Sequence, residues 1–560
     1  MSGETLIDAL TERAARAPQE LALVFIGEDG TQERVSAGAF HKNALAYAHA
    51  LQRIGAGEGD LVVLVLRHSP EVLYSFWGAL YVGAIPSIFP FLTEKLDRSI
   101  YGERVCELVS HSQARVALTY PEFKDELRLV LGAVDCLVLS TDELSPATSD
   151  TLQLSQQQEC LADKIAFLQH SSGTTGLQKG VALSHQSVLN QITAYGEAID
   201  LHPDDVIVSW LPLYHDMGLI AGFIMPLVRR VPLVLLSPFH WVRDPAALFR
   251  ALHEHRGTLC WLPNFAYNHS VRSVRQRDLQ GLDLQHWRMA INCSEPVRHD
   301  SHRLFLQKFA PVGFQDSALA TCYAMAENTF AVTQTVPSQP AHVDWVDRAA
   351  LQMKGRAAPG EVEGAGTTPV VSCGYPIPGT EIAISAESGQ LLGERRVGEI
   401  LIRSNCMLTG YYRRPDLDRE AFAGGWYRSG DVGYLAGGQL YLTGRKKELI
   451  IVGGKNIYPQ DVEALATQMS GIHPGRAVAF GLPDSRLGTE RIILVCELAG
   501  TAGASERKQI ETELRQSALQ LLDVTLGDVR LVERRWLLKT SSGKIARSLN
   551  RDKYLREFGS

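Results

Sequence analysis

The sequence predicts an α/β protein: a large N-terminal domain of layered α/β sheets with a small antiparallel β subdomain, followed by a small, mobile α+β C-terminal domain. Three observations support this prediction. From about residue 60, short apolar runs alternate with helical patterns, which is typical of a largely parallel sheet covered by helices. After about residue 370, short β segments between glycine-rich turns replace that alternation. The chain has 560 residues, too many for one hydrophobic core.

The N-terminal elements follow from capping signals and apolar periodicity. Thr5 with Asp8 three residues later is the pattern of a capped helix start. A helix is predicted over Pro70–Tyr81 and a buried helix over Gly218–Val228. Strands are predicted at Leu61–Leu66, Val116–Thr119, Ile165–Leu168, Val181–Ser184, Val206–Trp210, Val231–Leu236, Leu259–Leu262 and Met289–Asn292.

The later part of the chain divides into two regions. Short β segments at Gly379–Ile384, Val397–Arg403 and Gln439–Thr443 predict the antiparallel subdomain. Beyond Gly444 a separate module mixes strands with a helix near Arg507–Leu522, and its length suits a domain. We therefore expect an N-terminal domain over residues 1–444 and a second domain over residues 445–560. The Pro/Gly/Thr-rich stretch Ala357–Thr368 is predicted to be a surface loop.

Composition narrows the class of protein. The net charge is -7, and no basic run exceeds short pairs and triplets, so a nucleic-acid-binding protein is not expected. The nine cysteines form no CxxC pair, which argues against a disulfide framework or zinc site and favours a cytoplasmic protein. Met1–Gln19 lacks the apolar core of a signal peptide, and the longest apolar runs are too short for a transmembrane segment. A monomer or weak dimer is expected.

A loop of small and hydroxylated residues is the clearest chemical signal. It runs from Ser171 to Gly180, after a predicted strand. Small residues let the backbone approach a phosphate, consecutive N–H groups form an anion nest, and Lys179 adds charge. The alternative is an ordinary polar turn. The Walker A spacing is absent, which argues against P-loop kinases and GTPases. The candidate ligands in the loop are Ser171, Ser172, Gly173, Thr174, Thr175, Gly176 and Lys179.

This loop resembles the phosphate-binding signature of the adenylate-forming superfamily, although Gln178 stands where that family usually has proline. Further segments match the same family in the same order along the chain. They are Trp210–Asp216, Tyr323–Glu327, Gly410–Tyr412, Tyr427–Asp431, Gly444–Glu448 and Ser542–Lys544. Seven ordered matches across almost the whole chain make coincidence an unsatisfactory explanation.

The resemblance implies ATP and Mg²⁺ as cofactors and gives roles to individual residues. Lys544 would be catalytic, bridging the substrate carboxylate and the α-phosphate, and Glu327 would hold Mg²⁺. Asp431 and Arg445 would bind the ribose, and Tyr323 would stack on adenine. Lys447 would be the hinge about which the C-terminal domain rotates. Further nucleotide-binding candidates are Ser294, Glu295, Pro296, Ala324, Met325 and Ala326. Ordinary alternatives are core packing for Tyr323, a turn for Asp431, and a solvated charge for Glu327, Arg445 and Lys544.

Three features resemble fatty acyl-AMP ligases more than CoA ligases. They are the Leu211–Ile220 stretch, the segments Leu262–Tyr267 and Asn292–Val297, and a candidate family insertion at about 346–370. This resemblance implies activation of a fatty or related carboxylic acid and transfer to the phosphopantetheine of an acyl carrier protein. Acyl-pocket candidates, which are equally good core candidates, are His215, Asp216, Gly218, Asn264, Phe265 and Tyr267. His215 is also a catalytic candidate, with a structural histidine as the alternative.

Two other functions remain open at this stage. The segment Gly453–Pro459 looks more like a CoA ligase, so an acyl- or aryl-CoA ligase is the second hypothesis. A non-catalytic nucleotide-binding protein of the same fold is the third. The joint presence of Glu327, Asp431, Arg445 and Lys544 argues against that third hypothesis. The identity of the acid is open.

Overall fold

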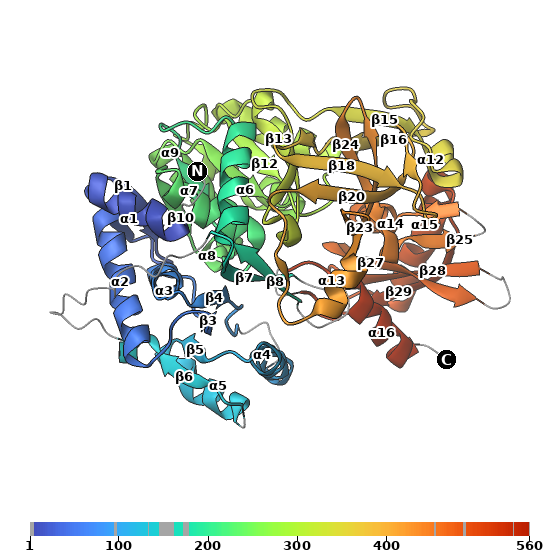
Figure 1. Ribbon diagram of the computed structural model, residues 1–560. Helices are drawn as coiled ribbons and strands as arrows, with labels where there is room; N and C mark the ends of the chain where they lie inside the picture. Colours follow the sequence, from blue (N-terminus) through green and yellow to red (C-terminus); the bar gives the residue numbers. More distant parts are fainter. Residues whose placement is uncertain are drawn as a thin grey trace.

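The computed structural model describes residues 5–93, 98–132, 134–144, 162–171, 179–452, 455–484, 489–540 and 543–558. These residues form layered sheets with helices on their faces, which confirms the predicted α/β class (Figure 1). The helices are α1 (Leu6–Arg16), α2 (Ala37–Arg53), α3 (Pro70–Tyr81), α4 (Arg98–Ser112), α5 (Lys124–Leu131), α6 (His185–Ala198), α7 (Met225–Val228), α8 (Pro238–Arg243), α9 (Ala246–Glu254), α10 (Asn264–Ser273), α11 (His299–Phe309), α12 (Arg348–Lys354), α13 (Pro415–Ala421), α14 (Pro459–Gln468), α15 (Ala504–Leu522) and α16 (Arg547–Phe558).

The largest sheet in the described part of the chain has parallel strands at its centre and antiparallel strands at its edges. Its order is β17 (Tyr375–Pro376), β14 (Ala331–Gln334), β13 (Leu319–Ala324), β12 (Met289–Asn292), β11 (Leu259–Leu262), β9 (Ile207–Ser209), β10 (Leu233–Leu236), β1 (Leu21–Ile26) and β2 (Gln32–Ser36). Because the central strands are parallel, the segments that follow them emerge at one edge of the sheet, where ligands bind in open α/β sheets.

A second sheet lies beside the first, and one large apolar core fills the space between the two sheets and their helices. Its order is β21 (Gly410–Tyr411), β8 (Lys179–Ser184), β7 (Ile165–Ser171), β4 (Ile85–Ile88), β3 (Leu61–Val65), β5 (Val116–Thr119) and β6 (Leu137–Ser140). β3 is buried along its whole length, as expected for a parallel strand covered on both faces.

The predicted antiparallel subdomain is a third sheet. Its strands are β19 (Leu391–Leu392), β18 (Thr380–Ser385), β20 (Gly398–Ser404), β23 (Trp426–Ala436), β22 (Phe422–Ala423) and β24 (Gln439–Arg445). β24 ends at Arg445, so this sheet leads directly into the C-terminal elements.

The elements from Lys446 onward, called the C-terminal module below, build cores of their own. β27 (Ile472–Asp484), β28 (Thr489–Leu498) and β29 (Leu526–Val532) form its sheet, with a short hairpin of β25 (Ile450–Val452) and β26 (Lys455–Ile457) beside it. Alternate residues of β27 and β28 face opposite sides of the sheet. One side packs on α14 and α15, and the other packs on Tyr554 of α16. The boundary at residue 444/445 stays a prediction, which these separate cores support.

Most predicted elements are confirmed, with one informative difference. Thr5 and Asp8 form the expected reciprocal capping box at the start of α1. The predicted helix over Gly218–Val228 is mainly a π-helix, Met217–Ile224, continued by α7. π-Helical segments are rare in proteins, and those that do occur are frequently found at functional sites. No helix among the described residues is both long and apolar enough to cross a membrane.

The candidate insertion is an ordered unit. β15 (Val343–Asp347) and β16 (Thr367–Val371) form an antiparallel hairpin, and α12 lies between them in the chain. The predicted surface loop begins three residues after the end of α12, and its last two residues belong to β16. Several of its residues are exposed, but Ala357 is buried in a small core. A small core joins Val346 and Leu351 of this unit to Tyr434 and Tyr441 of the third sheet and to Tyr458 of the C-terminal module.

A buried carboxylate anchors this hairpin. Asp344 accepts hydrogen bonds from Arg395 Nη1 at 3.0 Å and from the Tyr434 hydroxyl at 2.7 Å. Asp344 → Ala should lower the apparent free energy of unfolding in urea by about 2 kcal/mol, because it leaves a partly buried guanidinium and a buried hydroxyl without their acceptor. Asp416 → Ala, which removes an exposed ion pair with Arg414, should change it by less than about 0.5 kcal/mol. Equal effects of the two substitutions would contradict this account.

Candidate active site

The predicted site residues gather at the carboxyl edge of the central parallel strands. Cys293–Val297 follow β12, and Met325–Glu327 follow β13. Asp431 lies in β23 and Arg445 ends β24, which brings the third sheet to the same place. The C-terminal module supplies Lys544 from the turn before α16. Four separate stretches of chain therefore meet around one space.

Lys544 joins the C-terminal module to the N-terminal part of the site. Its Nζ donates to the Ser294 carbonyl at 2.6 Å. The lysine lies in a tight turn, because the Thr540 N–H donates to the Lys544 carbonyl at 2.7 Å. Its ammonium also interacts electrostatically with Asp216 and Glu295. A single positive charge thus sits opposite two carboxylates.

Ser294 has an unusual backbone. Its φ is 67°, in the left-handed region that is unfavourable for residues other than glycine. The next residue, Glu295, accepts a hydrogen bond from the Phe265 N–H at 2.8 Å, at the N-terminus of α10. A carboxylate is favourable there because of the helix dipole. Burial raises the pKa of Glu295, and Lys544 opposes that shift. The left-handed turn at Ser294 and the hydrogen bond between Glu295 and the N-terminus of α10 therefore hold this segment in place.

His215 and Asp216 directly precede the π-helix and lie close to Lys544. Burial, with a smaller effect from Lys544, lowers the pKa of His215 to about 3, so the imidazole is neutral at physiological pH. Its Nε2 is buried with no partner in the described structure. Burial raises the pKa of Asp216 to about 6, although the Met217 N–H donates to its carboxylate at 2.8 Å. Two neighbouring groups therefore have pKa values displaced in ways that are typical of functional sites.

Asp431 is the centre of a second polar cluster. The Tyr323 hydroxyl donates to Asp431 Oδ2 at 2.7 Å, and Arg445 Nε donates to Oδ1 at 3.1 Å. The Ser429 hydroxyl accepts from the Asp431 N–H at 3.1 Å. Burial, with a smaller effect from Asp431, raises the pKa of Tyr323 well above its usual value. Asp431 is only 7% exposed, and its carboxylate has more acceptor sites than these two side-chain donors fill, so it can also accept from hydroxyl donors.

Glu327 forms a third polar position. The Tyr411 hydroxyl donates to its Oε1 at 3.0 Å and lies 3.1 Å from the Tyr427 hydroxyl. Lys179 lies with Nζ 4.9 Å from the centre of the Tyr411 ring, in the range of a cation–π contact. The Glu327 carboxylate is a hard oxygen donor that keeps free lone pairs. Mg²⁺ binds through one or two such carboxylates together with phosphates and water, so the residues present fit that ion.

Other candidates take simpler places. Ala324 ends β13, Met325 donates its N–H to the Phe330 carbonyl, and Ala326 begins a short 3₁₀ turn. Pro296 is exposed, and Lys447 is exposed in the 3₁₀ turn Lys446–Glu448 that opens the C-terminal module. Ser171 ends β7. The candidates Ser172, Gly173, Thr174, Thr175 and Gly176 lie outside the described residues, as do Gly453 and Gly454.

The acyl-pocket candidates differ in whether a side chain is exposed or packed in the core. Gly218 must be glycine, because a Cβ there would lie 2.2 Å from the Pro212 carbonyl oxygen. Phe265 is 40% exposed and packs edge-on against a stacked pair, Trp210 and Trp241. Tyr267 is fully buried, and its hydroxyl donates to the Ala290 carbonyl at 2.9 Å. Core packing therefore describes Tyr267 better than a place in a pocket wall, whereas Phe265 keeps a free face.

Asn264 is a scaffold residue rather than a wall of the pocket. Its Oδ1 accepts from Asn292 Nδ2 at 3.1 Å and from the Arg298 N–H at 3.0 Å, and its Nδ2 donates to the Ser301 hydroxyl. Reasoning from sequence did not single out Arg298, although it directly follows the Asn292–Val297 segment. Its polar partners lie far away in the chain, so the sequence offered no signal.

Comparison with known proteins identifies the family. The profile of the AMP-binding enzyme family matches residues 10–412. The chain is 30% identical over 591 aligned positions to 4-hydroxyphenylalkanoate adenylyltransferase from Mycobacterium tuberculosis, covering 99% of this chain and 92% of the relative. It is 32% identical over 577 positions to a medium-chain-fatty-acid–[acyl-carrier-protein] ligase from Moorena producens, covering 98% and 95%.

A solved structure from work on fatty acyl-adenylate ligases of E. coli and L. pneumophila has the same fold. It superposes with a TM-score of 0.90 at 30% identity, over 99% of this chain and 98% of that one. The chain therefore belongs to the AMP-binding enzyme family of the adenylate-forming superfamily. It is an enzyme of the class that uses ATP and Mg²⁺ to form adenylates.

The raised pKa of Asp216 predicts a pH-dependent stability. Because the folded pKa of about 6 lies above the unfolded value of 3.8, the folded state binds more protons, and this group costs stability as pH rises from about 4 through 6. Asp216 → Asn mimics the protonated carboxyl. It should raise the thermal midpoint at pH 8 and leave it nearly unchanged at pH 4.5. The exposed Glu361 → Gln should show no such difference between the two pH values, and a uniform shift for Asp216 → Asn would contradict the assignment.

Proposed function

We propose that the protein activates a fatty or related carboxylic acid with ATP, forming an acyl-adenylate and pyrophosphate, and passes the acyl group to the phosphopantetheine thiol of an acyl carrier protein. The observation that carries this proposal is the position of Lys544. Its ammonium reaches the Ser294 carbonyl and faces Glu295 and Asp216, while Glu327 and the Asp431 cluster lie on the N-terminal side of the same site.

The residues divide the work of adenylation between them. A carboxylate oxygen of the acid attacks the α-phosphorus, and the bond from that phosphorus to the leaving pyrophosphate breaks. Lys544 neutralises the negative charge that the carboxylate and α-phosphate bring together. Asp431 accepts hydrogen bonds from the ribose hydroxyls, and Tyr323 and Arg445 hold its carboxylate in place. Neutral His215 lines the carboxylate end of the acyl pocket without adding charge.

Glu327 would hold Mg²⁺. When bound, the ion neutralises phosphate charge and makes pyrophosphate a better leaving group. Tyr411 orients the Glu327 carboxylate through its hydrogen bond. The loop from Ser171 to Gly180 would supply phosphate-binding N–H groups, and Lys179 would add a positive charge at its end.

The proposed acyl pocket is aromatic. Trp210 and Trp241 are stacked with ring centres 3.7 Å apart, and Phe265 lies edge-on to both. The exposed face of Phe265 suits an apolar or aromatic acyl group. Named relatives act on both kinds of acid, since one is a 4-hydroxyphenylalkanoate adenylyltransferase and another a medium-chain fatty acid ligase. The proposal therefore covers fatty and arylalkanoic acids.

Two observations favour a carrier protein over CoA. A relative that aligns over 98% of this chain is a fatty-acid–[acyl-carrier-protein] ligase. The unit β15–α12–β16 packs against the C-terminal module, where Arg348 donates to the Leu521 carbonyl and Tyr458 joins the shared core. The CoA ligase hypothesis is retained because of the Gly453–Pro459 segment, part of which lies outside the described residues.

Lys544 → Ala should reduce adenylate formation by at least about 100-fold, because it removes the charge that stabilises the transition state. The measurement is acid-dependent exchange of pyrophosphate into ATP, with a panel of fatty and arylalkanoic acids. Lys553 → Ala is the matched control and should retain activity, because Lys553 lies in α16 of the same module and its ammonium donates to the Trp536 carbonyl at 2.8 Å. Full activity of Lys544 → Ala would contradict the mechanism, and ATP-dependent thermal stabilisation without any exchange would favour the non-catalytic hypothesis.

The identity of the acyl acceptor is tested by changing only the thiol compound that is offered to the enzyme. The purified protein, ATP and the best acid are incubated with a phosphopantetheinylated carrier protein, with the same carrier lacking that arm, or with CoA. We expect acyl transfer to the phosphopantetheinylated carrier, detected as a mass increase of the carrier, and at most about a tenth of that rate with CoA. Efficient acyl-CoA formation would instead support the CoA ligase hypothesis.

A further inference from the structure

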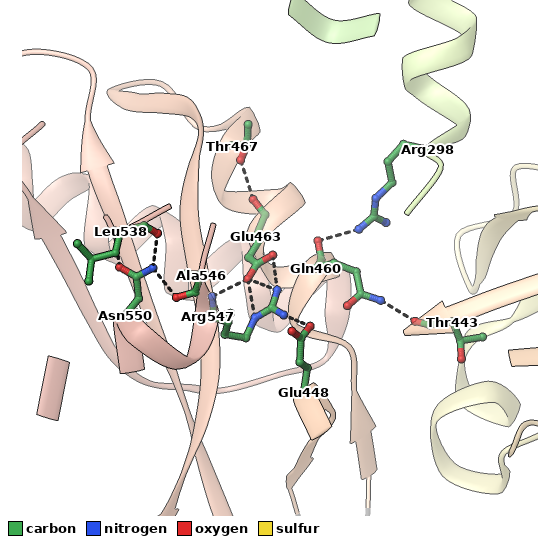
Figure 2. A network of polar contacts seen from close by, with 11 residues as sticks. Arg298, Thr443, Glu448, Gln460, Glu463, Thr467, Leu538, Ala546, Arg547 and Asn550 are labelled. Carbon is green, nitrogen blue, oxygen red and sulfur yellow. Dashed lines mark hydrogen bonds and ion pairs between the residues drawn. The ribbon is translucent and has the colours of Figure 1, made fainter. Parts of the chain in front are cut away.

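Arg298 links the active-site segment to the C-terminal module. Its Nη1 donates to Asp461 Oδ1 at 3.0 Å. Its Nη2 donates to the Gln460 carbonyl at 2.8 Å, a contact that Figure 2 shows. Both acceptors belong to the first turn of α14. About a third of each charged side chain is exposed, so the pair is shielded without being buried. Charge-assisted hydrogen bonds of this kind are stronger than neutral ones and are geometrically specific.

The N-terminal side of this link is rigid. The Arg298 N–H donates to Asn264 Oδ1, and Asn264 is itself held by Asn292 and Ser301. Arg298 lies four residues after Ser294, whose carbonyl accepts from Lys544. The short segment from Ser294 to Arg298 therefore contacts the C-terminal module at both of its ends: once at the catalytic lysine and once at α14.

The C-terminal side of the link leads back to Lys544. On α14, Glu463 accepts from Arg547 Nη2 at 2.7 Å and 2.9 Å through its two carboxylate oxygens. Arg547 opens α16, three residues after Lys544, and also pairs with Glu448 (Figure 2). Glu448 lies in the 3₁₀ turn that begins the module. Figure 2 shows the contact of Arg298 with Gln460 and the contacts of Arg547 with Glu463 and Glu448. The two sets of contacts are joined by α14, because Gln460 and Glu463 both lie on that helix.

A further contact joins the start of α14 to the third sheet. Gln460 Nε2 donates to the Thr443 carbonyl in β24 at 2.6 Å, just before the chain enters the C-terminal module. The start of α14 thus touches the third sheet through Gln460 and the segment after β12 through Arg298 and Asp461. Two contacts at different places resist rotation about either one, which a single contact cannot do.

We infer that Arg298 is a positioning residue that holds α14, and through Glu463 and Arg547 the Lys544 turn, in the arrangement that delivers Lys544 to the site. Arg298 does not touch the reacting atoms. Its loss lowers the fraction of molecules in which Lys544 is in place. The kcat of adenylation falls, while the KM for ATP changes little because the nucleotide contacts of Asp431 and Tyr323 remain. The expected fall in kcat rests on the proposed adenylation function. The expected change in the position of Lys544 does not.

The kinetic test compares Arg298 → Ala, Asp461 → Asn and their combination in acid-dependent pyrophosphate exchange. We expect Arg298 → Ala to lower kcat about tenfold. Asp461 → Asn should lower it less, because the Gln460 carbonyl still accepts from Arg298, and the double variant should be no worse than Arg298 → Ala, since Asp461 acts through Arg298. Arg298 → Lys should recover part of the loss. Arg303 → Ala is the matched control, because Arg303 lies on α11 and pairs only locally with the exposed Asp300 among the contacts described. Additive losses in the double variant would overturn the inference.

A second readout does not depend on activity. The purified chain is treated briefly with an amine-modifying reagent, and the modification of Lys544 is quantified by mass spectrometry relative to exposed Lys447. Arg298 → Ala should raise the relative labelling of Lys544 several-fold, whereas Arg303 → Ala should not change it. Unchanged Lys544 labelling in a variant with a normal thermal midpoint overturns the inference. If no acid supports exchange but labelling still rises, the positioning role stands and the proposed function fails. If Arg298 → Ala does not fold, Arg298 → Lys and Asp461 → Asn provide the same comparison.

Discussion

The hydrogen bond from Lys544 to the Ser294 carbonyl is the interaction on which the arrangement of this enzyme depends. It brings together two groups that are 250 residues apart in the chain. An ammonium is costly to remove from water, so it must be met by acceptors and opposite charge. The Ser294 carbonyl and the carboxyl groups of Glu295 and Asp216 meet that requirement. Lys544 in turn lowers the pKa values of these two carboxyl groups, against the effect of burial. A site built in this way is complete only when both parts of the chain are present.

The fold class was predictable because the apolar runs, the helical patterns and the capping signals all indicate the same α/β arrangement. Apolar runs of strand length recur between helical patterns, and β3, β5, β11 and β12 lie where those runs occur. The capping box of α1 was readable because it is local, spanning four residues. The π-helix was not predicted, since its residues are apolar on every side and a pattern without periodicity cannot distinguish one helical pitch from another.

The site was predictable only in part, and the limits are physical. Charged residues at Glu327, Asp431, Arg445 and Lys544 could be recognised because their sequence contexts match a family. Tyr267 could not be assigned in the same way, because a pocket wall and a core have the same composition; its hydroxyl bond to Ala290 shows that it belongs to the core. Arg298 had no local signature. Its partner Asp461 lies 163 residues away, a relation that exists only after folding.

The backbone of Ser294 has a consequence for the order in which the site forms. A left-handed conformation at a residue with a side chain costs about 1–2 kcal/mol, and the surrounding structure must impose it. Here β12, the N-terminus of α10 and the bonds of Asn264 impose it, and all of them belong to the N-terminal part of the chain. The orientation of the Ser294 carbonyl is therefore held by contacts that do not involve Lys544. A C-terminal module that rotates, as the family resemblance implies, would return to a surface whose shape does not depend on the contact with Lys544.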